Sequence, residues 1–128
     1  MAKIFNLTNH AATGLQIADA VQTLGVVECV DLPPQLKKLW GEIPPGIDTV
    51  VNFVQPVLDW LEQVTLQGDV VWAQGEWGAT VCAIQWCRIH GIRCVYSTTE
   101  RFAVERKMDD GSIAITHQFK HVRFRDYP

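Results

Sequence analysis

The chain has 128 residues, of which 48% are hydrophobic and 20% charged, and its formal net charge is −3. These values are typical of one globular domain and argue against a disordered or two-domain chain. We expect a single domain over residues 1–128. A chain of this size buries roughly two thirds of its extended surface, so its core needs neither disulfides nor a structural metal.

No apolar run approaches the roughly 20 residues of a membrane span. The N-terminus lacks the basic-then-apolar layout of a signal peptide. The sequence therefore predicts a cytoplasmic protein without a membrane partner, and its four cysteines are expected to be reduced thiols.

Charge is distributed unevenly along the chain. Residues 1–87 hold 3 basic and 9 acidic side chains, a balance of −6, and residues 88–128 hold 8 basic and 5 acidic, a balance of +3. An anion is thus expected near the C-terminal third. Overall acidity argues against long nucleic acid as a partner, because such binding needs a broad basic surface. A small anion remains possible, as does a simple solvating role for these arginines.

The first third of the chain has a β-α-β pattern. Residues 2–6 are expected to form a strand, residues 13–24 a helix with apolar side chains near helical spacing, and residues 26–30 a second strand. Gly25 supplies the stop between the helix and the second strand.

Two helices are expected next. A short one begins at Pro33-Pro34 and ends before residues 44–46. A longer one is expected over residues 48–66, where apolar side chains step by three and four. Pro56 should either kink this helix or mark its true start.

Residues 69–74 form a nearly unbroken apolar run, which is typical of a central parallel strand covered on both faces. A helix over residues 77–90 should bury Val81 and Ile84, and residues 92–96 should form the next strand.

The rhythm changes after this strand. Two β-like segments, residues 102–107 and 112–118, flank Asp110-Gly111, which is a strong hairpin signal, and residues 118–125 can continue the second arm. The expected fold is α/β: a small Rossmann-like, mostly parallel sheet flanked by helices, with a C-terminal β-hairpin.

In an open parallel sheet, ligands bind beyond the carboxyl ends of the strands. This rule selects three segments, residues 6–10, 74–80 and 97–101, each rich in short polar side chains or glycine. Ligand contacts are expected from Thr8, Asn9, Gln74, Gly75, Trp77, Gly78, Thr98, Thr99 and Arg106.

The glycine-containing segment matches neither the dinucleotide fingerprint nor the phosphate loop. Backbone amides near Gly75 and Gly78 could still hold one phosphodiester oxygen. Glu76 is either a helix cap or an acceptor for a ribose hydroxyl or adenine amino group. Trp77 either stacks on a base or anchors a core or interface.

Three side chains are candidates for acid-base or charge chemistry. His10 lies in a strand-end segment and is either a proton shuttle or a surface or capping histidine. Arg101 and Arg106 are the cations expected to face the pocket, because guanidinium suits phosphodiester oxygens.

No metal site is predicted. His117 and His121 stand four apart in a strand-like segment without a third ligand. Cys82, Cys87 and His90 make no zinc signature, so the cysteines are expected to be small buried apolar groups.

Short motifs spread along nearly the whole chain carry a family resemblance. They are Leu24-Gly25-Val26, Leu32-Pro33, Leu39-Trp40, Ile43-Pro44-Pro45, Gly68-Asp69, Gln74-Gly75-Glu76, Gly78-Ala79-Thr80, Thr98-Thr99, Arg101, Glu105, Phe119, His121-Val122 and Phe124-Arg125. Together they resemble the small stand-alone ring nucleases of type III CRISPR systems, a Csx-type group related to the CARF sensor fold. The resemblance implies a homodimer without a cofactor. It would linearise a cyclic oligoadenylate, with the tetra-adenylate expected first, and switch off the antiviral response.

Cleavage of such a ring needs no metal if each ribose 2′-hydroxyl attacks its own phosphate. His10 or Glu76 would be the base, and Thr98 or Thr99 would orient the ribose. Arg101, with amides near Gly75, would meet the developing charge. Two alternatives remain: a module that sequesters the messenger without cutting it, and an enzyme for another small nucleotide or a metal-dependent nuclease.

Overall fold

The computed structural model describes residues 1–128 and contains one five-stranded sheet in the order β2-β1-β3-β4-β5. The strands are β1 (Lys3–Leu7), β2 (Glu28–Asp31), β3 (Val70–Ala73), β4 (Arg93–Lys107) and β5 (Ile113–Asp126). The helical segments are α1 (Gly14–Asp19), the π-helix η1 (Ala20–Leu24), α2 (Pro34–Gly41), α3 (Gln55–Val64) and α4 (Trp77–His90).

The sheet is mixed. β1 pairs in parallel with β2 and β3, β3 pairs in parallel with β4, and β5 pairs antiparallel to β4. All four residues of β3 are buried, which confirms the expected central strand. Its side chains must be apolar on both sides because helices cover both faces.

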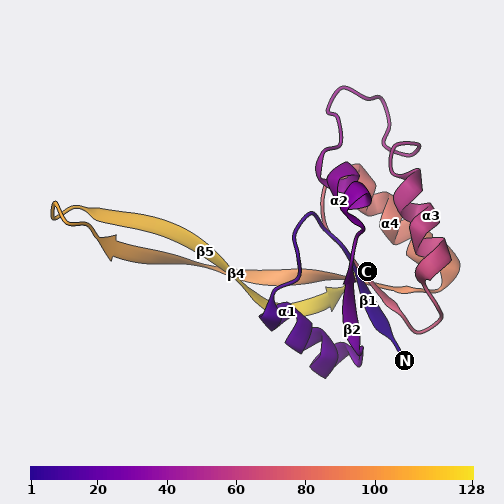
Figure 1. Cartoon of the computed structure of the whole chain (residues 1–128), viewed down its shortest axis with the longest axis horizontal. Coiled ribbons are helices and arrows are strands. Elements are labelled where there is room, and N and C mark those ends of the chain that lie inside the picture. Colours follow the sequence, from indigo (N-terminus) through magenta and orange to yellow (C-terminus); the bar gives the residue numbers. More distant parts are fainter.

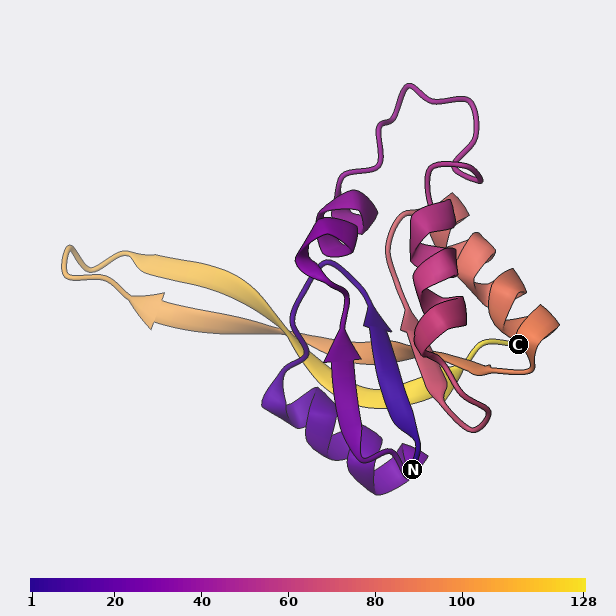
Figure 2. The same cartoon turned by 45° about the vertical axis from the view of Figure 1, so that its right-hand side comes forward.

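Helices form one layer on each face of the sheet (Figures 1 and 2). On one face α1 and η1 cover a small core. On the other face α2, α3 and α4 cover a larger one. The smaller core consists of Ile4, Ala20, Val26, Val70, Trp72, Val95 and Phe124.

Two expected helices have different bounds. The helix expected over residues 48–66 begins only at Gln55, with Pro56 in its first turn, where a missing N–H costs nothing. The helix expected over residues 13–24 follows α geometry to Asp19 and then widens to a π-helix. Gly25 ends it in the left-handed conformation, with φ of 70°, as expected.

Helix α4 has the expected bounds but a different buried face. Val81 is 50% exposed, and the buried positions are Ala79, Ala83, Trp86 and Cys87. The expectation for Val81 was wrong, because Val81 lies on the side of the helix that faces away from the sheet.

The largest correction concerns residues 97–101, which were expected to be a loop. They lie within β4, a 15-residue strand that continues to Lys107. Polar residues form a strand here because β5 runs antiparallel alongside and pairs with them, Thr99 with His121 and Arg101 with Phe119. The turn between the strands falls at residues 108–112, and Gly111 has a φ of 86°.

The outer parts of β4 and β5 form a two-stranded ribbon that projects far from the body of the molecule (Figure 1). Several of its apolar side chains are exposed: Phe102, Ile113, Ile115 and Phe119. An isolated two-stranded ribbon is only marginally stable in water, so this ribbon gains from any surface that covers it. None of the helices combines the length and apolar character that crossing a bilayer requires.

Asp69 connects the start of β1 to the turn between α3 and β3. Its buried carboxylate accepts hydrogen bonds from the backbone N–H groups of Lys3 at 2.9 Å and Leu66 at 2.8 Å. Asp69→Ala leaves both donors without this acceptor, and we expect a loss of about 1–3 kcal/mol in the free energy of unfolding by chemical denaturation. Asp69→Asn, which keeps one acceptor oxygen, should lose less.

The matched control is Asp59→Ala on α3, where the carboxylate is exposed and accepts only from Gln55 at 2.8 Å. It should change stability by no more than about 0.5 kcal/mol. Equal losses for the two alanine variants would contradict the structural role of Asp69.

Candidate functional site

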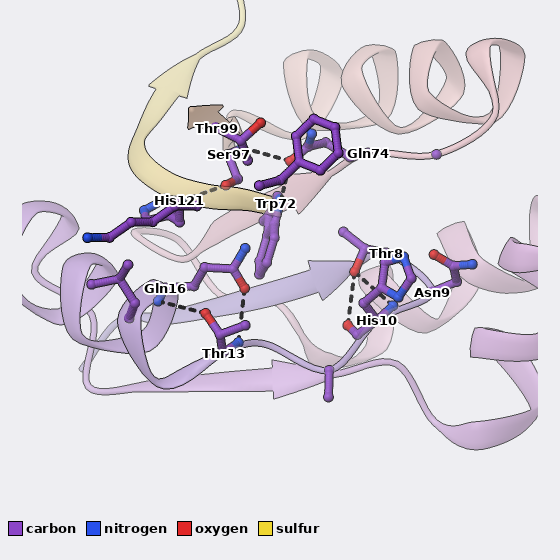
Figure 3. Close-up of a pocket in the computed structure, with 15 residues that line it drawn as sticks. Thr8, Asn9, His10, Thr13, Gln16, Trp72, Gln74, Ser97, Thr99 and His121 are labelled. Atoms are coloured by element: carbon purple, nitrogen blue, oxygen red, sulfur yellow. Dashed lines mark hydrogen bonds between the residues drawn. The ribbon is translucent and has the colours of Figure 1, made fainter. Parts of the chain in front are cut away.

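The largest cavity lies at the carboxyl ends of β1 and β3 and along the middle of β4, on the α1 side of the sheet (Figure 3). Its volume is about 850 Å³, within the roughly 300–1,000 Å³ common for small-molecule sites. The lining residues are Thr8, Asn9, His10, Ala11, Thr13, Leu15, Gln16, Trp72, Gln74, Gly75, Ser97, Thr99, Phe119, Lys120 and His121.

The chemistry of this lining is polar but not acidic. Hydroxyl, amide and imidazole groups dominate, Lys120 is the one lysine, and no aspartate or glutamate is among the 15 lining residues. The protein as a whole carries more acidic than basic side chains. A cavity that omits carboxylates in an acidic protein is suited to an anionic or hydrogen-bonding ligand.

The segment after β1 is held in place by its own hydrogen bonds. The His10 carbonyl accepts from Asn6 Nδ2 at 2.8 Å and from Thr8 Oγ1 at 3.0 Å. Asn6 is fully buried, and the same amide group also donates to Asp31 Oδ1 at 2.9 Å. The main chain of this segment is therefore fixed, while the side chain of His10 remains exposed at the cavity.

The segment after β3 is fixed by Gln74. Its side-chain oxygen accepts from Trp72 Nε1 at 2.7 Å and from the backbone N–H of Ser97 at 2.7 Å. Its backbone carbonyl accepts from Trp40 Nε1 at 3.1 Å. Gly75 lies so close to this indole that an added Cβ would stand 2.6 Å from Trp40 Nε1. Glycine is therefore required here for packing.

Glu76 is the N-cap of α4, which is one of the two roles that the sequence suggests for it. Its carboxylate accepts from the backbone N–H groups of Gly78 and Ala79 at the start of α4. It lies outside the large cavity, against a neighbouring one of about 290 Å³. The amides of Gly78 and Ala79 thus already have a carboxylate partner, which leaves them less suited to hold a phosphodiester oxygen.

The structure brings together six of the expected site residues around the large cavity. They are Thr8, Asn9, His10, Gln74, Gly75 and Thr99. Thr98 lies on the opposite side of β4, and its hydroxyl donates to the Arg123 carbonyl at 3.0 Å. Trp77, at the first position of α4, is 90% exposed and lines none of the cavities described here.

The two expected arginines lie on the projecting ribbon. The Arg101 guanidinium stands 6.0 Å from the ring centre of Phe119, which lines the cavity, so Arg101 lies near its rim. Arg106 pairs with Ala114 near the tip. It is five residues beyond Arg101 along the strand, about 17 Å at the usual rise per residue, and strand alternation puts the two side chains on opposite faces. The two arginines therefore cannot both face the cavity of one protomer.

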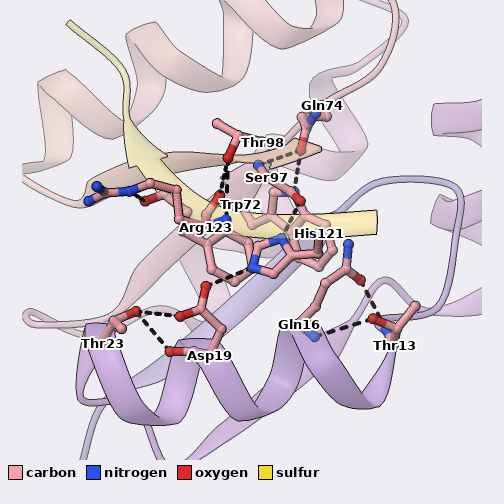
Figure 4. Close-up of polar contacts among 11 residues, drawn as sticks. Thr13, Gln16, Asp19, Thr23, Trp72, Gln74, Ser97, Thr98, His121 and Arg123 are labelled. Carbon is pink, nitrogen blue, oxygen red and sulfur yellow. Dashed lines mark hydrogen bonds and ion pairs between the residues drawn. The ribbon is translucent and has the colours of Figure 1, made fainter. Parts of the chain in front are cut away.

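Sequence reasoning missed the most strongly connected polar group in this region. Ser97 Oγ lies 2.5 Å from His121 Nδ1, and His121 Nε2 lies 2.6 Å from Asp19 Oδ2 (Figure 4). Sequence spacing relates His121 only to His117, which lies four residues farther out on the exposed ribbon, and the His121-Val122 motif of the family resemblance gives His121 no role. Asp19 stands 102 residues away in the chain and has no sequence signal that links it to His121.

The cysteines are free thiols. Burial and the nearby Asp31 raise the pKa of Cys29 to about 11. A hydrogen bond with Cys94 and burial raise the pKa of Cys87, and burial also raises that of Cys82. Since the thiolate is the reactive form, these three residues are poor nucleophiles at neutral pH. No cluster of three or more His, Cys, Asp or Glu side chains is placed to hold a metal ion.

The fold and cavity define a class: an α/β protein with a mixed five-stranded sheet, a strand-end polar cavity and a projecting antiparallel ribbon. The chain belongs to the MJ1673 family, described as the uncharacterized protein MJ1673 family, whose model matches residues 2–125. It is 39% identical over 127 residues to the uncharacterized protein MJ1673 of Methanocaldococcus jannaschii, covering 99% of this chain and 98% of that protein. No solved structure matches.

Gly75→Ala tests the packing that shapes the cavity floor. The new Cβ would clash with the buried indole of Trp40, so we expect a loss of about 1–3 kcal/mol in the free energy of unfolding. Gly14→Ala is the control, because nothing lies within 4 Å of its Cβ position at the start of α1. It should be neutral or stabilise by up to about 1 kcal/mol. A neutral Gly75→Ala variant would contradict the close packing.

Proposed function

We propose that the protein is a ring nuclease: it binds a cyclic oligoadenylate and linearises it, ending type III CRISPR signalling. The observation that carries the proposal is the cavity at the strand ends, which is lined by polar side chains and by no carboxylate. The resemblance supplies the ligand class, and we place the sheet among Rossmann-like, CARF-related folds on the same basis. Because cyclic oligoadenylate messengers are made inside the cell, we propose that the protein is located in the cytoplasm.

The cavity chemistry suits an adenylate ring. The Asn9 amide offers both a donor and an acceptor, and the amides of Gln16 and Gln74, whose oxygens already accept N–H groups of the protein, offer Nε2 donors to adenine edges and ribose hydroxyls. Lys120 would balance phosphate charge, and the His10 imidazole would contact the phosphate groups. Phe119, which is 68% exposed at the mouth, offers a ring on which a base can stack.

A two-fold dimer would match the symmetry of the ligand. A ring of four identical nucleotides presents equivalent halves, and two copies of one cavity would contact them in the same way. The projecting ribbon supports this proposal. Ile113 and Ile115 share one of its faces, where their partners on β4 are Lys107 and Glu105, and both isoleucines are about 60% exposed, at 62% and 59%. A second copy would cover them.

Cleavage then requires only that the ribose be held for in-line attack of its 2′-hydroxyl on the adjacent phosphate. His10 lines the cavity and is the member of the expected catalytic set best placed to exchange a proton there. Arg101 at the rim would contact phosphate groups of the ligand. Glu76, held by its capping bonds, would act only by shaping the neighbouring cavity.

The test is incubation of purified protein with cyclic tri-, tetra- and hexa-adenylate, with and without EDTA, followed by mass spectrometry. We expect linear products with 2′,3′-cyclic phosphate ends, unchanged by chelator. In single-turnover assays His10→Ala should slow cleavage by about 10²-fold or more, and Arg101→Ala should weaken binding. Rings recovered intact after tight binding would favour the sequestering alternative. Activity abolished by EDTA would favour a metal-dependent nuclease.

The dimer makes a separate prediction. Replacing both Ile113 and Ile115 with Lys should convert a dimer to a monomer in sedimentation analysis, because the interface would lose its apolar contacts and gain two charges that must be desolvated. Thr116→Lys, on the opposite face of the same strand, is the control and should stay dimeric. A wild-type protein that sediments as a monomer, with or without cyclic tetra-adenylate, would overturn the dimer.

A further inference from the structure

Ser97, His121 and Asp19 form a continuous hydrogen-bonded chain between the cavity and α1 (Figure 4). Ser97 comes from β4, His121 from β5 and Asp19 from the last residue of α1. Ser97 and His121 are both buried and both line the cavity, whereas Asp19 stands behind His121 and does not. Ser97 at one end of this hydrogen-bonded series can therefore contact a ligand in the cavity, whereas Asp19 at the other end cannot.

The hydrogen bonds select one tautomer of a neutral His121. A carboxylate only accepts hydrogen bonds, so the contact of 2.6 Å between Asp19 Oδ2 and His121 Nε2 places the proton on Nε2. In the neutral imidazole, Nδ1 then has a free lone pair, and the Ser97 hydroxyl 2.5 Å away donates to it. Ser97 Oγ is left with lone pairs that a hydroxyl group of a bound ligand can use.

Neighbouring groups hold each member in this orientation. The Thr23 hydroxyl is shared between the Asp19 backbone carbonyl at 2.8 Å and Asp19 Oδ1 at 3.1 Å, and Gln74 Oε1 accepts from the Ser97 backbone N–H at 2.7 Å. The His121 ring packs against Phe124 with ring centres 4.7 Å apart. Such support fixes a side chain in one rotamer and, for histidine, in one tautomer.

Two backbone irregularities create the arrangement. Ser97 pairs with Phe124 and Thr99 with His121, so Val122 is an extra residue on β5 without a partner. This bulge lets His121 and Phe124, three residues apart, share the face that α1 covers. On the other side, Asp19 is the last residue before the π-helix η1. Bulges and π-helical turns are both frequent at functional sites.

We propose that Ser97, His121 and Asp19 are the proton relay of the cleavage reaction; this inference rests on the proposed ring nuclease function. The ribose 2′-hydroxyl gives its proton to Ser97 Oγ while Ser97 gives its own to His121 Nδ1. The bond from the 2′-oxygen to phosphorus forms and the bond from phosphorus to the 5′-oxygen breaks. The leaving oxygen takes a proton from the His10 imidazolium, which lies on the other side of the cavity in Figure 3.

Charge is balanced through the step. His121 becomes an imidazolium beside the Asp19 carboxylate, which stabilises it, and His10 becomes neutral. Transfer of a proton back from His121 to His10 through water restores the starting state. Ser97 and His10 touch the reacting groups, whereas Asp19 acts through His121 and is a positioning residue.

The experiment measures single-turnover cleavage of cyclic tetra-adenylate by the full-length protein and its variants. Ser97→Ala and His121→Gln should each slow cleavage by about 10²- to 10⁴-fold. Their affinity for a ring with 2′-fluoro ribose, which cannot be cut, should stay within about threefold of wild type. His117→Gln on the same strand is the matched control and should cleave at the wild-type rate.

A spectroscopic readout tests Asp19 apart from activity. In ¹⁵N-labelled wild-type protein, NMR should find the neutral His121 ring with its proton on Nε2. Asp19→Asn offers an amide donor and should move the proton to Nδ1, while thermal unfolding stays cooperative. Such a variant should lose activity with the ligand still bound, and Asp19→Glu should recover part of it.

The outcomes separate the two proposals. A wild-type protein that cuts no cyclic oligoadenylate overturns the proposed function, and the relay falls with it. Wild-type cleavage with Ser97→Ala and His121→Gln variants that fold and cut within threefold of wild type overturns the relay alone. A covalent phosphoserine at Ser97 in a trapped reaction also overturns it, because Ser97 would then be the nucleophile.

Discussion

The pairing of β4 with β5 determines where the polar side chains of this protein lie. The first residues of β4 are largely buried, and antiparallel pairing with β5 continues the strand through the polar residues that follow. On β5, the single unpaired residue Val122 changes which side of the strand faces α1. In a regular strand, in which Val122 took its own paired position, alternation would put His121 and Phe124, three residues apart, on opposite faces. The core contact of Phe124 and the cavity position of His121 are compatible only through this bulge.

The electrostatics of the cavity follow from the same arrangement. Asp19 is close to the cavity but stands behind His121, so its carboxylate contacts the imidazole and does not line the cavity. Glu76 is likewise turned to the start of α4. An acidic protein thus keeps its carboxylates out of its largest cavity, which makes binding of an anion compatible with a net charge of −3.

The ribbon links the cavity to the outer surface. Its inner end contributes Thr99 and Phe119 to the cavity, and its outer end exposes apolar residues on a structure with little support of its own. A partner that covers the ribbon would therefore also act near the mouth of the cavity.

Local patterns in the sequence were sufficient for the central strand, for the bounds of α4 and for the turn at Gly111, because burial, capping and turn geometry depend on neighbouring residues. They also located Thr8, His10, Gln74 and Gly75 at strand ends. The strand character of residues 97–101 and the contact of His121 with Asp19 were decided by tertiary structure alone. A polar segment becomes a strand only when a partner supplies its hydrogen bonds, and no local pattern brings together groups 102 residues apart.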